Sequence, residues 1–367
     1  MQTIVICSYT KTGIGTFNKH MRHLFCLLVV FAASCKQQNS DPVRSVPKVP
    51  ISFRAFDRSL FALDTNQLEQ ELMVLEQQEN NFSTIFLGNV LGLGSATNNS
   101  AERINALRLF LRLHRSVSDT ARKVFRNRTT LEETITDGFT RLHYYFPDYE
   151  LPKTVYWTLG PLDALPPMSN GEPSPNFIGP NFVAIGMQFY LGADYSIYND
   201  PGYASAYVPQ FRSRRFSKPY LAADLFSLVL DDLLPDSSKR LPLVEQFVER
   251  GKRKYLLQLL LPQAHDSIIM GYTGKQVSWC RENQRSIFNF FTQQQLLFER
   301  DPALVQGFVT DGPFTQGMPA ESPGNIANFI GTEIVRAWVK RHPNATPAQI
   351  VSTDARSIYN GSAYKPR

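Results

Sequence analysis

Two kinds of side chain in this sequence could do chemistry: a thiol near the amino terminus and a few carboxylates in the middle of the chain. Cys35 directly follows the small residues Ala32, Ala33 and Ser34, which close the apolar run LFCLLVVFAAS. Small residues before a cysteine, at the end of a short apolar segment, are typical of a bacterial lipoprotein signal whose thiol receives diacylglycerol. The sequence therefore predicts acylation of Cys35; cleavage at a nearby bond without lipidation is the alternative.

The leader has the order of an export signal if it begins at Met21. Arg22 supplies a positive charge, and the apolar run is shorter than the roughly 20 residues that a permanent spanning helix needs. We expect residues 1–20 to be a misplaced gene start that is not translated and residues 21–34 to be the signal peptide. Residues 35–50, which end in the proline-rich stretch KQQNSDPVRSVPKVP, are expected to form a lipid-anchored flexible tether.

Loss of the leader changes the charge and the cysteine content. The formal net charge of +6 falls to +3 once Lys11, Lys19 and Arg22 are removed, and so small a charge does not indicate nucleic-acid binding. The mature chain keeps only Cys280 besides the acylated Cys35, so no internal disulfide is predicted.

A lone carboxylate interrupts an apolar helical pattern in Pro219–Leu234, PYLAADLFSLVLDDLL. From Tyr220 to Leu230 every face of this helix is apolar except at Asp224 and Ser227, which is typical of a helix buried all round. An unpaired buried charge costs on the order of several kcal/mol, so the carboxyl group must find a partner or keep its proton. Two interpretations remain open: Asp224 caps a backbone or pairs with an arginine, or it forms the floor of a pocket.

The next helical pattern, Val244–Pro262, carries Glu249, which can reach Arg253 one turn later. A local ion pair is the simple explanation for this glutamate. No complete triad, nucleotide loop or metal motif accompanies the two carboxylates, so we predict no catalytic residue, no metal and no cofactor. The histidines of the mature chain are scattered, and none is paired at a metal-binding spacing: His114, His143, His265 and His342.

The remaining patterns predict a mostly helical α+β fold with a single globular domain over residues 51–367. Strand patterns separated by helical segments and a Pro- and Gly-rich loop are expected at Ile51–Asp64, Lys153–Leu159 and Asn181–Ile185. Helical patterns cover Asn66–Gln78, Ala101–Val117 and Leu131–Tyr145 in the first half. Late helices are expected to begin at Ser322–Pro323 and at Thr346–Pro347, where an N-cap residue precedes proline.

Several segments, taken in order, resemble those of one protein family. They are the leader ending in Cys35, FDRSLFALD, MQFYLGADYSIY, GKRKYLLQLLLP, QVSWCRENQRSIFNFF, DGPFTQGMPAESPGNIANFIGTEIVR and the terminal SAYKPR. Across the mature chain they resemble the gliding motility lipoprotein GldB family of the Bacteroidetes. The resemblance implies a cell-envelope lipoprotein required for gliding, associated with the type IX secretion machinery, with a structural or interaction role and no enzymatic activity. It implies contact with a lipid bilayer through acylated Cys35 and with other gliding or secretion proteins, and we expect the body to face the periplasm.

The central region is similar, more distantly, to zincin-like metallopeptidases, in which two histidines and a glutamate of an HExxH helix build the zinc site. The matching window places Tyr220 and Asp224 at the ligand positions and Leu221 at the general base, and Glu249 corresponds to the third ligand. A phenol and two carboxylates make a poor zinc site. The similarity implies a degenerate zincin-like scaffold with a pocket at Tyr220, Asp224 and Glu249; a metallopeptidase-like hydrolase with an atypical site is the alternative function.

Overall fold

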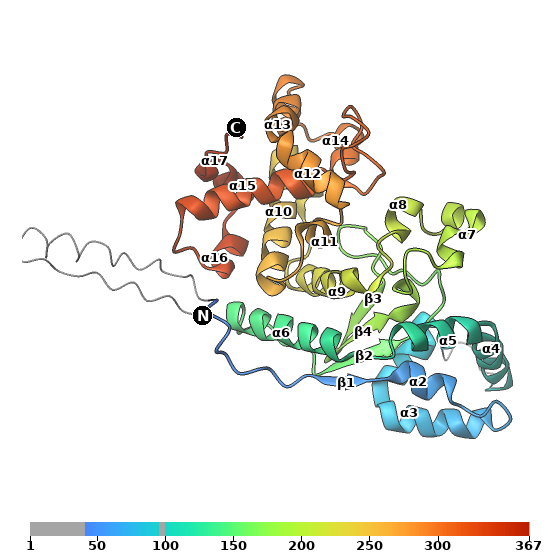
Figure 1. Cartoon of the computed structure of the whole chain (residues 1–367). Coiled ribbons are helices and arrows are strands. Elements are labelled where there is room, and N and C mark those ends of the chain that lie inside the picture. The colour runs from blue at the N-terminus through green and yellow to red at the C-terminus, as the bar shows by residue number, and fades with distance from the viewer. Residues whose placement is uncertain (1–40, 95–99, 367) are drawn as a thin grey trace, which may run out of the picture. The chain divides into compact units, whose positions relative to one another are not determined.

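The computed structural model describes residues 41–94 and 100–366, and the chain divides into two units, Met1–Ser45 and Val46–Arg367. The predicted leader and Cys35 lie outside the described residues. The larger unit contains every helix and strand that the described ranges hold (Figure 1). It takes in Val46–Pro50, the end of the predicted tether, where the backbone N–H of Val49 donates a hydrogen bond to Thr140 Oγ1 at 3.2 Å.

A small mixed sheet of four strands lies in the first half of this unit, in the order β1-β2-β4-β3. Strands β1, β2 and β4 run parallel, whereas β3 is antiparallel to β4. The central strands read TVYWT and FVAIG and are almost wholly buried, as expected for strands covered on both faces. The bounds are Ser52–Arg54 for β1, Thr154–Thr158 for β2, Asn176–Gly179 for β3 and Phe182–Gly186 for β4.

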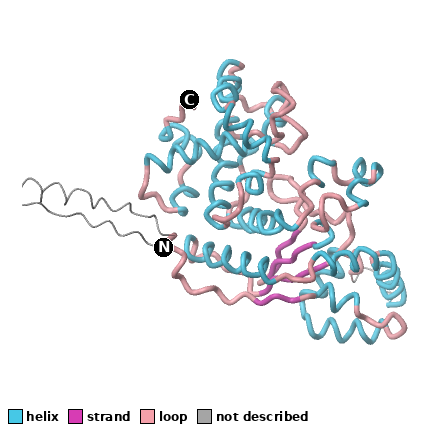
Figure 2. Tube along the Cα trace, viewed as in Figure 1, coloured by secondary structure: helices cyan, strands magenta, loops and turns pink. Residues whose placement is uncertain are grey.

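Helices make up most of the rest, as Figure 2 shows. Those up to residue 233 are α2 (Phe56–Phe61), α3 (Leu68–Ile85), a short π-helix (Phe86–Val90), α4 (Ser100–Leu113), α5 (Arg115–Val124), α6 (Thr129–Tyr145), α7 (Pro201–Ala206), α8 (Gln210–Ser213) and α9 (Lys218–Leu233). The helices after residue 233 are α10 (Leu243–Leu260), α11 (Asp266–Met270), α12 (Gly274–Glu282), α13 (Gln284–Gln293), α14 (Pro302–Val309), α15 (Ala327–Arg341), α16 (Pro347–Ser352) and α17 (Ala355–Ser362). Short 3₁₀ turns lie at Met187–Phe189, Ser196–Asn199, Ser238–Arg240 and Leu296–Phe298. In the ranges 41–94 and 100–366, no helix combines the length and the apolar character that crossing a bilayer requires.

Apolar side chains form two clusters that share one helix. The first surrounds the sheet and includes Trp157 and Phe226, and the second lies among the C-terminal helices and includes Phe291. Helix α10 supplies Leu257 to the first cluster and Phe247 to the second. This helix therefore connects the sheet region with the C-terminal helices.

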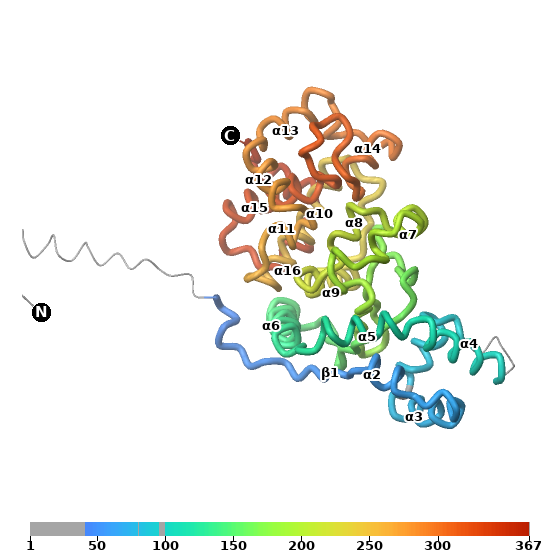
Figure 3. The backbone as a smooth tube through the Cα atoms, turned by 45° about the vertical axis from the view of Figure 1, so that its right-hand side comes forward, coloured from blue at the N-terminus to red at the C-terminus, as the bar shows by residue number. Residues whose placement is uncertain are grey.

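Helices α10 and α15 lie next to each other (Figure 3). Their backbones are in contact at two glycines. A Cβ atom on Gly331 would overlap the carbonyl oxygen of Phe247, and one on Gly251 would overlap the carbonyl group of Gly331. Only glycine permits so close an approach of two backbones. The crossing fixes the position of α10 relative to α15.

The structure confirms a mostly helical α+β body with a small sheet. Strands β2 and β4 lie at the two central strand patterns, and the whole of α9 from Leu221 to Leu230 is buried except at Asp224 and Ser227. The capping box at Thr346 is confirmed, because its hydroxyl accepts from the Gln349 backbone and the Gln349 side chain accepts in return.

Other local predictions need correction. The pattern at Ile51–Asp64 forms β1 and then helix α2, and the helix expected over Ala101–Val117 is interrupted at His114 between α4 and α5. Ser322 does not cap a helix, because α15 begins at Ala327. The buried Ser322 hydroxyl instead accepts a hydrogen bond from the backbone of Thr315 at 3.1 Å.

Candidate functional site

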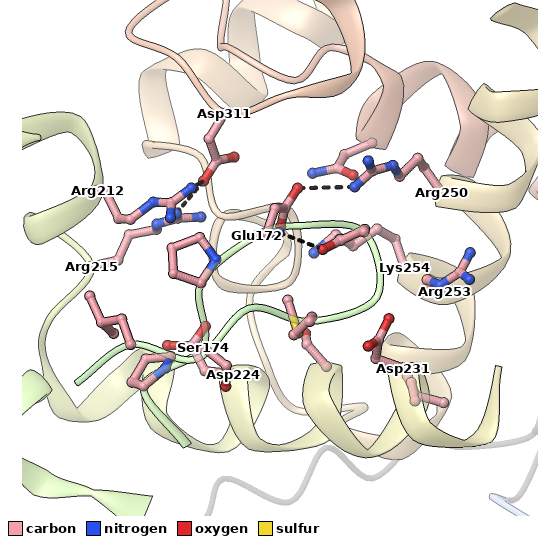
Figure 4. A pocket seen from close by; sticks show the side chains of 18 of the residues that line it. Glu172, Ser174, Arg212, Arg215, Asp224, Asp231, Arg250, Arg253, Lys254 and Asp311 are labelled. Carbon is pink, nitrogen blue, oxygen red and sulfur yellow. Dashed lines mark hydrogen bonds and ion pairs between the residues drawn. The ribbon is translucent and has the colours of Figure 1, made fainter. Parts of the chain in front are cut away.

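A cavity of about 100 Å³ lies between α9, α10 and the loop that precedes β3 (Figure 4). A single water needs roughly 10–15 Å³ of such space, so the cavity has room for a ligand of several heavy atoms. Its lining is unusually rich in charge for an interior site. Five cations and four acids contribute: Arg212, Arg215, Arg250, Arg253 and Lys254, with Glu172, Asp224, Asp231 and Asp311.

On one side of the cavity, Asp311 holds two arginines. Its Oδ2 atom accepts hydrogen bonds from Arg212 Nη2 at 3.0 Å and from Arg215 Nη2 at 2.5 Å. Burial opposes ionisation of this carboxyl group, but the two guanidinium groups outweigh it and hold the pKa of Asp311 well below its usual range. Asp311 is therefore ionised, and its charge is already shared by two partners.

Glu172, in the loop before β3, forms an ion pair with Arg250 of helix α10. Arg250 Nη1 donates to Glu172 Oε1 at 3.0 Å, and Asn325 Nδ2 donates to the same oxygen at 3.2 Å. Asp236 lies on the other side of Arg250, with 3.9 Å between Arg250 Nη2 and Asp236 Oδ2. The Arg250 charge is thus balanced by neighbours on both sides.

The other two α10 cations that line the cavity, Arg253 and Lys254, have no close carboxylate partner in the described ranges. Arg253 donates to the backbone carbonyls of Glu249 at 3.0 Å and Leu234 at 2.6 Å, and its nearest carboxylate oxygen, on Glu249, is 3.9 Å away. Lys254 makes no hydrogen bond or ion pair with any residue in the described ranges. Burial lowers the pKa of Lys254, although the more distant carboxylates of Glu172 and Asp311 favour its charged form.

Two acids of helix α9 line the cavity, and in the described ranges they accept hydrogen bonds from neutral groups. Tyr190 donates its hydroxyl to Asp224 Oδ2 at 3.2 Å and accepts from Asn176 Nδ2 at 2.9 Å. Burial raises the pKa of Asp224 to about 6, and the charge of a neighbouring arginine limits the rise. Asp231 accepts from the backbone N–H of Ser169 at 2.7 Å and from its hydroxyl at 2.5 Å.

Of the three residues predicted for the pocket, the structure places only Asp224 in the lining of this cavity. Tyr220 lies one turn earlier on α9, where its hydroxyl interacts with Arg214. Glu249 lies on α10 and pairs with Lys252, at 2.7 Å between Oε1 and Nζ. Asp224 is the pocket-floor carboxylate of the second interpretation, and it has no arginine within ion-pair distance in the described part of the chain.

Sequence reasoning missed most of the charged lining. The spacing of Arg250, Arg253 and Lys254, at i, i+3 and i+4, places all three on one side of α10 and could have been found from the pattern. Glu172 and Asp311 come from irregular segments, and nothing in their local sequence indicates that they meet these cations.

The cavity can bind and orient a small charged ligand, because it offers donors and acceptors on different walls. Within residues 41–94 and 100–366, no three His, Cys, Asp or Glu side chains lie close enough together to hold a metal ion.

Comparison with known proteins gives one clear match. Searches of curated proteins and of solved structures found nothing similar to this chain. The model of the family described as "Gliding motility protein GldB", a lipoprotein family, matches residues 36–366. Because the match spans nearly the whole chain and begins directly after Cys35, this protein belongs to the GldB gliding motility lipoprotein family.

Proposed function

We propose that this protein is a lipid-anchored component of the gliding apparatus that works with the type IX secretion machinery by binding, not by catalysis. The observation that carries the proposal is the family match over residues 36–366. Because a lipoprotein family begins its match at the residue after Cys35, we assign this cysteine as the acylated residue. The acyl chains would hold the protein at a membrane with its body facing the periplasm, among other gliding and secretion proteins.

The arrangement of charged residues supports a binding role. Tyr220 and Glu249, which the hydrolase alternative needs beside Asp224, contact Arg214 and Lys252 instead. A degenerate zincin-like scaffold without its metal remains part of this proposal.

Deletion of the gene in its native host tests the biological role. We expect loss of colony spreading and altered secretion, with recovery of both when the wild-type gene is restored. A Cys35→Ala variant should be released from the membrane fraction and should fail to restore spreading. Spreading and membrane retention that are both normal in this variant would refute the anchor.

A double variant, Tyr220→Phe with Glu249→Gln, tests the non-catalytic part of the proposal without altering a cavity-lining residue. We expect it to restore spreading at normal protein levels. Failure to restore spreading, together with stoichiometric zinc in the dialysed wild-type protein, would favour the hydrolase alternative.

A further inference from the structure

Two walls of the interior cavity carry opposite charges that do not pair with each other. Asp224 and Asp231 line it from α9, whereas Arg253 and Lys254 line it from α10, as Figure 4 shows. Among the described residues, no ion pair within 4.0 Å joins an acid of α9 to a cation of α10. The acids of α9 and the cations of α10 therefore lie on separate walls of the cavity.

The groups on each wall keep unused hydrogen-bonding capacity. The Lys254 ammonium has three N–H donors and contacts no acceptor in the described ranges. Among the described residues, Asp224 accepts a hydrogen bond from the Tyr190 hydroxyl alone, although a carboxylate has about four acceptor positions. Both side chains are half-buried and line the cavity, so a ligand there could supply the partners that the described residues do not.

The charge balance of the lining restricts the chemistry of that partner. Five cations face four acids, so the site is close to neutral. A phosphate dianion would be repelled by the α9 acids, and a simple cation would be repelled by the α10 cations. A neutral molecule with separated charges would satisfy both walls at once.

We propose that the cavity binds a small zwitterion of the α-amino acid class. Its carboxylate would accept hydrogen bonds from Lys254 and Arg253, and its ammonium group would donate to Asp224. Leu165, Met168 and Phe216 are among the apolar residues of the lining, and a short aliphatic side chain of the ligand would pack against them. This inference goes beyond the proposed role in gliding and does not depend on it.

The test measures binding of defined small molecules to the purified full-length lipoprotein in mild detergent. L-alanine is compared at constant ionic strength with lactate, which lacks the ammonium group, and with alaninamide, which lacks the carboxylate. Calorimetric titration gives the affinity, and thermal unfolding gives an independent readout, because a ligand that binds only the folded state raises the Tm. We expect alanine to bind and to raise the Tm, and both analogues to have much weaker effects.

Two variants assign the binding to this cavity. Lys254→Met should weaken alanine binding about 10–100-fold, the usual effect of losing a hydrogen bond to a charged group. Ser227→Val reduces the space on the α9 wall without changing any charge and should also weaken binding. Lys340→Met, at an exposed position of α15, is the matched control and should bind alanine normally.

The outcomes separate clearly. Absence of binding by alanine and by valine would overturn the proposal, and so would equal binding of lactate, which would indicate a plain anion site. Tighter binding of dialanine than of alanine would overturn the assignment to a free amino acid. If Lys254→Met fails to fold, the wild-type titrations and the Ser227→Val variant still decide the question.

Discussion

Replacing Asp224 by asparagine should change how the stability of the protein depends on pH. The substitution keeps the size of the side chain and an acceptor for the Tyr190 hydroxyl, but it removes the titratable group. Burial raises the pKa of Asp224 from its ordinary value of 3.8 to about 6 in the folded protein. The folded state therefore holds the proton about a hundredfold more tightly than the unfolded state does.

Proton linkage determines whether this group makes the stability rise or fall with pH. Between about pH 4 and pH 6 the folded wild type binds more protons at this site than the unfolded chain, so its stability falls as the pH rises through this range. Each tenfold change in proton affinity corresponds to about 1.4 kcal/mol, so the full effect is about 3 kcal/mol. This is an upper value, because the side chain is partly accessible from a cavity that admits water.

Urea denaturation of wild type and Asp224→Asn, from pH 4.5 to pH 8 at constant ionic strength, measures the effect. Other titrating groups are common to both proteins, so they cancel in the difference between the two free energies of unfolding. Over this pH range we expect the wild type to lose up to about 2 kcal/mol relative to the variant as the pH rises, with a plateau above pH 7. A difference that stays constant with pH, or that grows in favour of the wild type at high pH, would refute the reasoning.

Three further changes test the packing. Gly251→Ala should destabilise the protein by about 1–3 kcal/mol or more, because its Cβ would overlap the backbone of α15. The control is Gly307→Ala, whose Cβ would meet one side-chain atom at 3.8 Å and which should stabilise α14 by about 0.5–1 kcal/mol. Equal effects of the two substitutions in thermal unfolding would contradict the close crossing. Asp57 and Arg128 form a buried ion pair with two N–O distances, 2.9 and 3.3 Å. Asp57→Asn removes the negative charge and should lower the free energy of unfolding, measured in urea, by about 3–5 kcal/mol. A loss below about 1 kcal/mol would show that the pair is dispensable. Burial raises the pKa of the Cys280 thiol to about 12, so it should react with an aromatic disulfide reagent at pH 8 only after unfolding; rapid labelling of the native protein would contradict its burial.

Local signals in the sequence account for the elements that were predicted well. The apolar runs of β2 and β4 and the capping residues at Thr346 each act over a few neighbouring positions, so they can be recognised without knowledge of the fold. Strand β3 was missed because its four residues lie in a loop rich in proline and glycine, and its pairing with β4 supplies the order that its own sequence does not indicate.

The residues that line the cavity were likewise predicted from the sequence only where a local pattern marked them. Asp224 could be found because one charge in an apolar helix is conspicuous. The meeting of Asp311 with Arg212 and Arg215 depends on segments about 100 residues apart in sequence, and no periodicity reports such a contact. Glu249 was assigned to the pocket as the counterpart of the third zincin ligand, but its interaction with Lys252 one turn away lies outside the cavity lining.

The glycine contact between α10 and α15 has a kinetic consequence for any molecule that occupies the cavity. Because the two backbones touch at Gly251 and Gly331, α10 cannot move aside to release an occupant without disrupting the C-terminal helices. The facing wall is the loop that carries Glu172, and a few side-chain hydrogen bonds, to Arg250 and Asp231, fasten that loop. Any widening of the cavity would therefore involve this loop, where the hydrogen bonds of Glu172 with Arg250 and Asn325 would have to break.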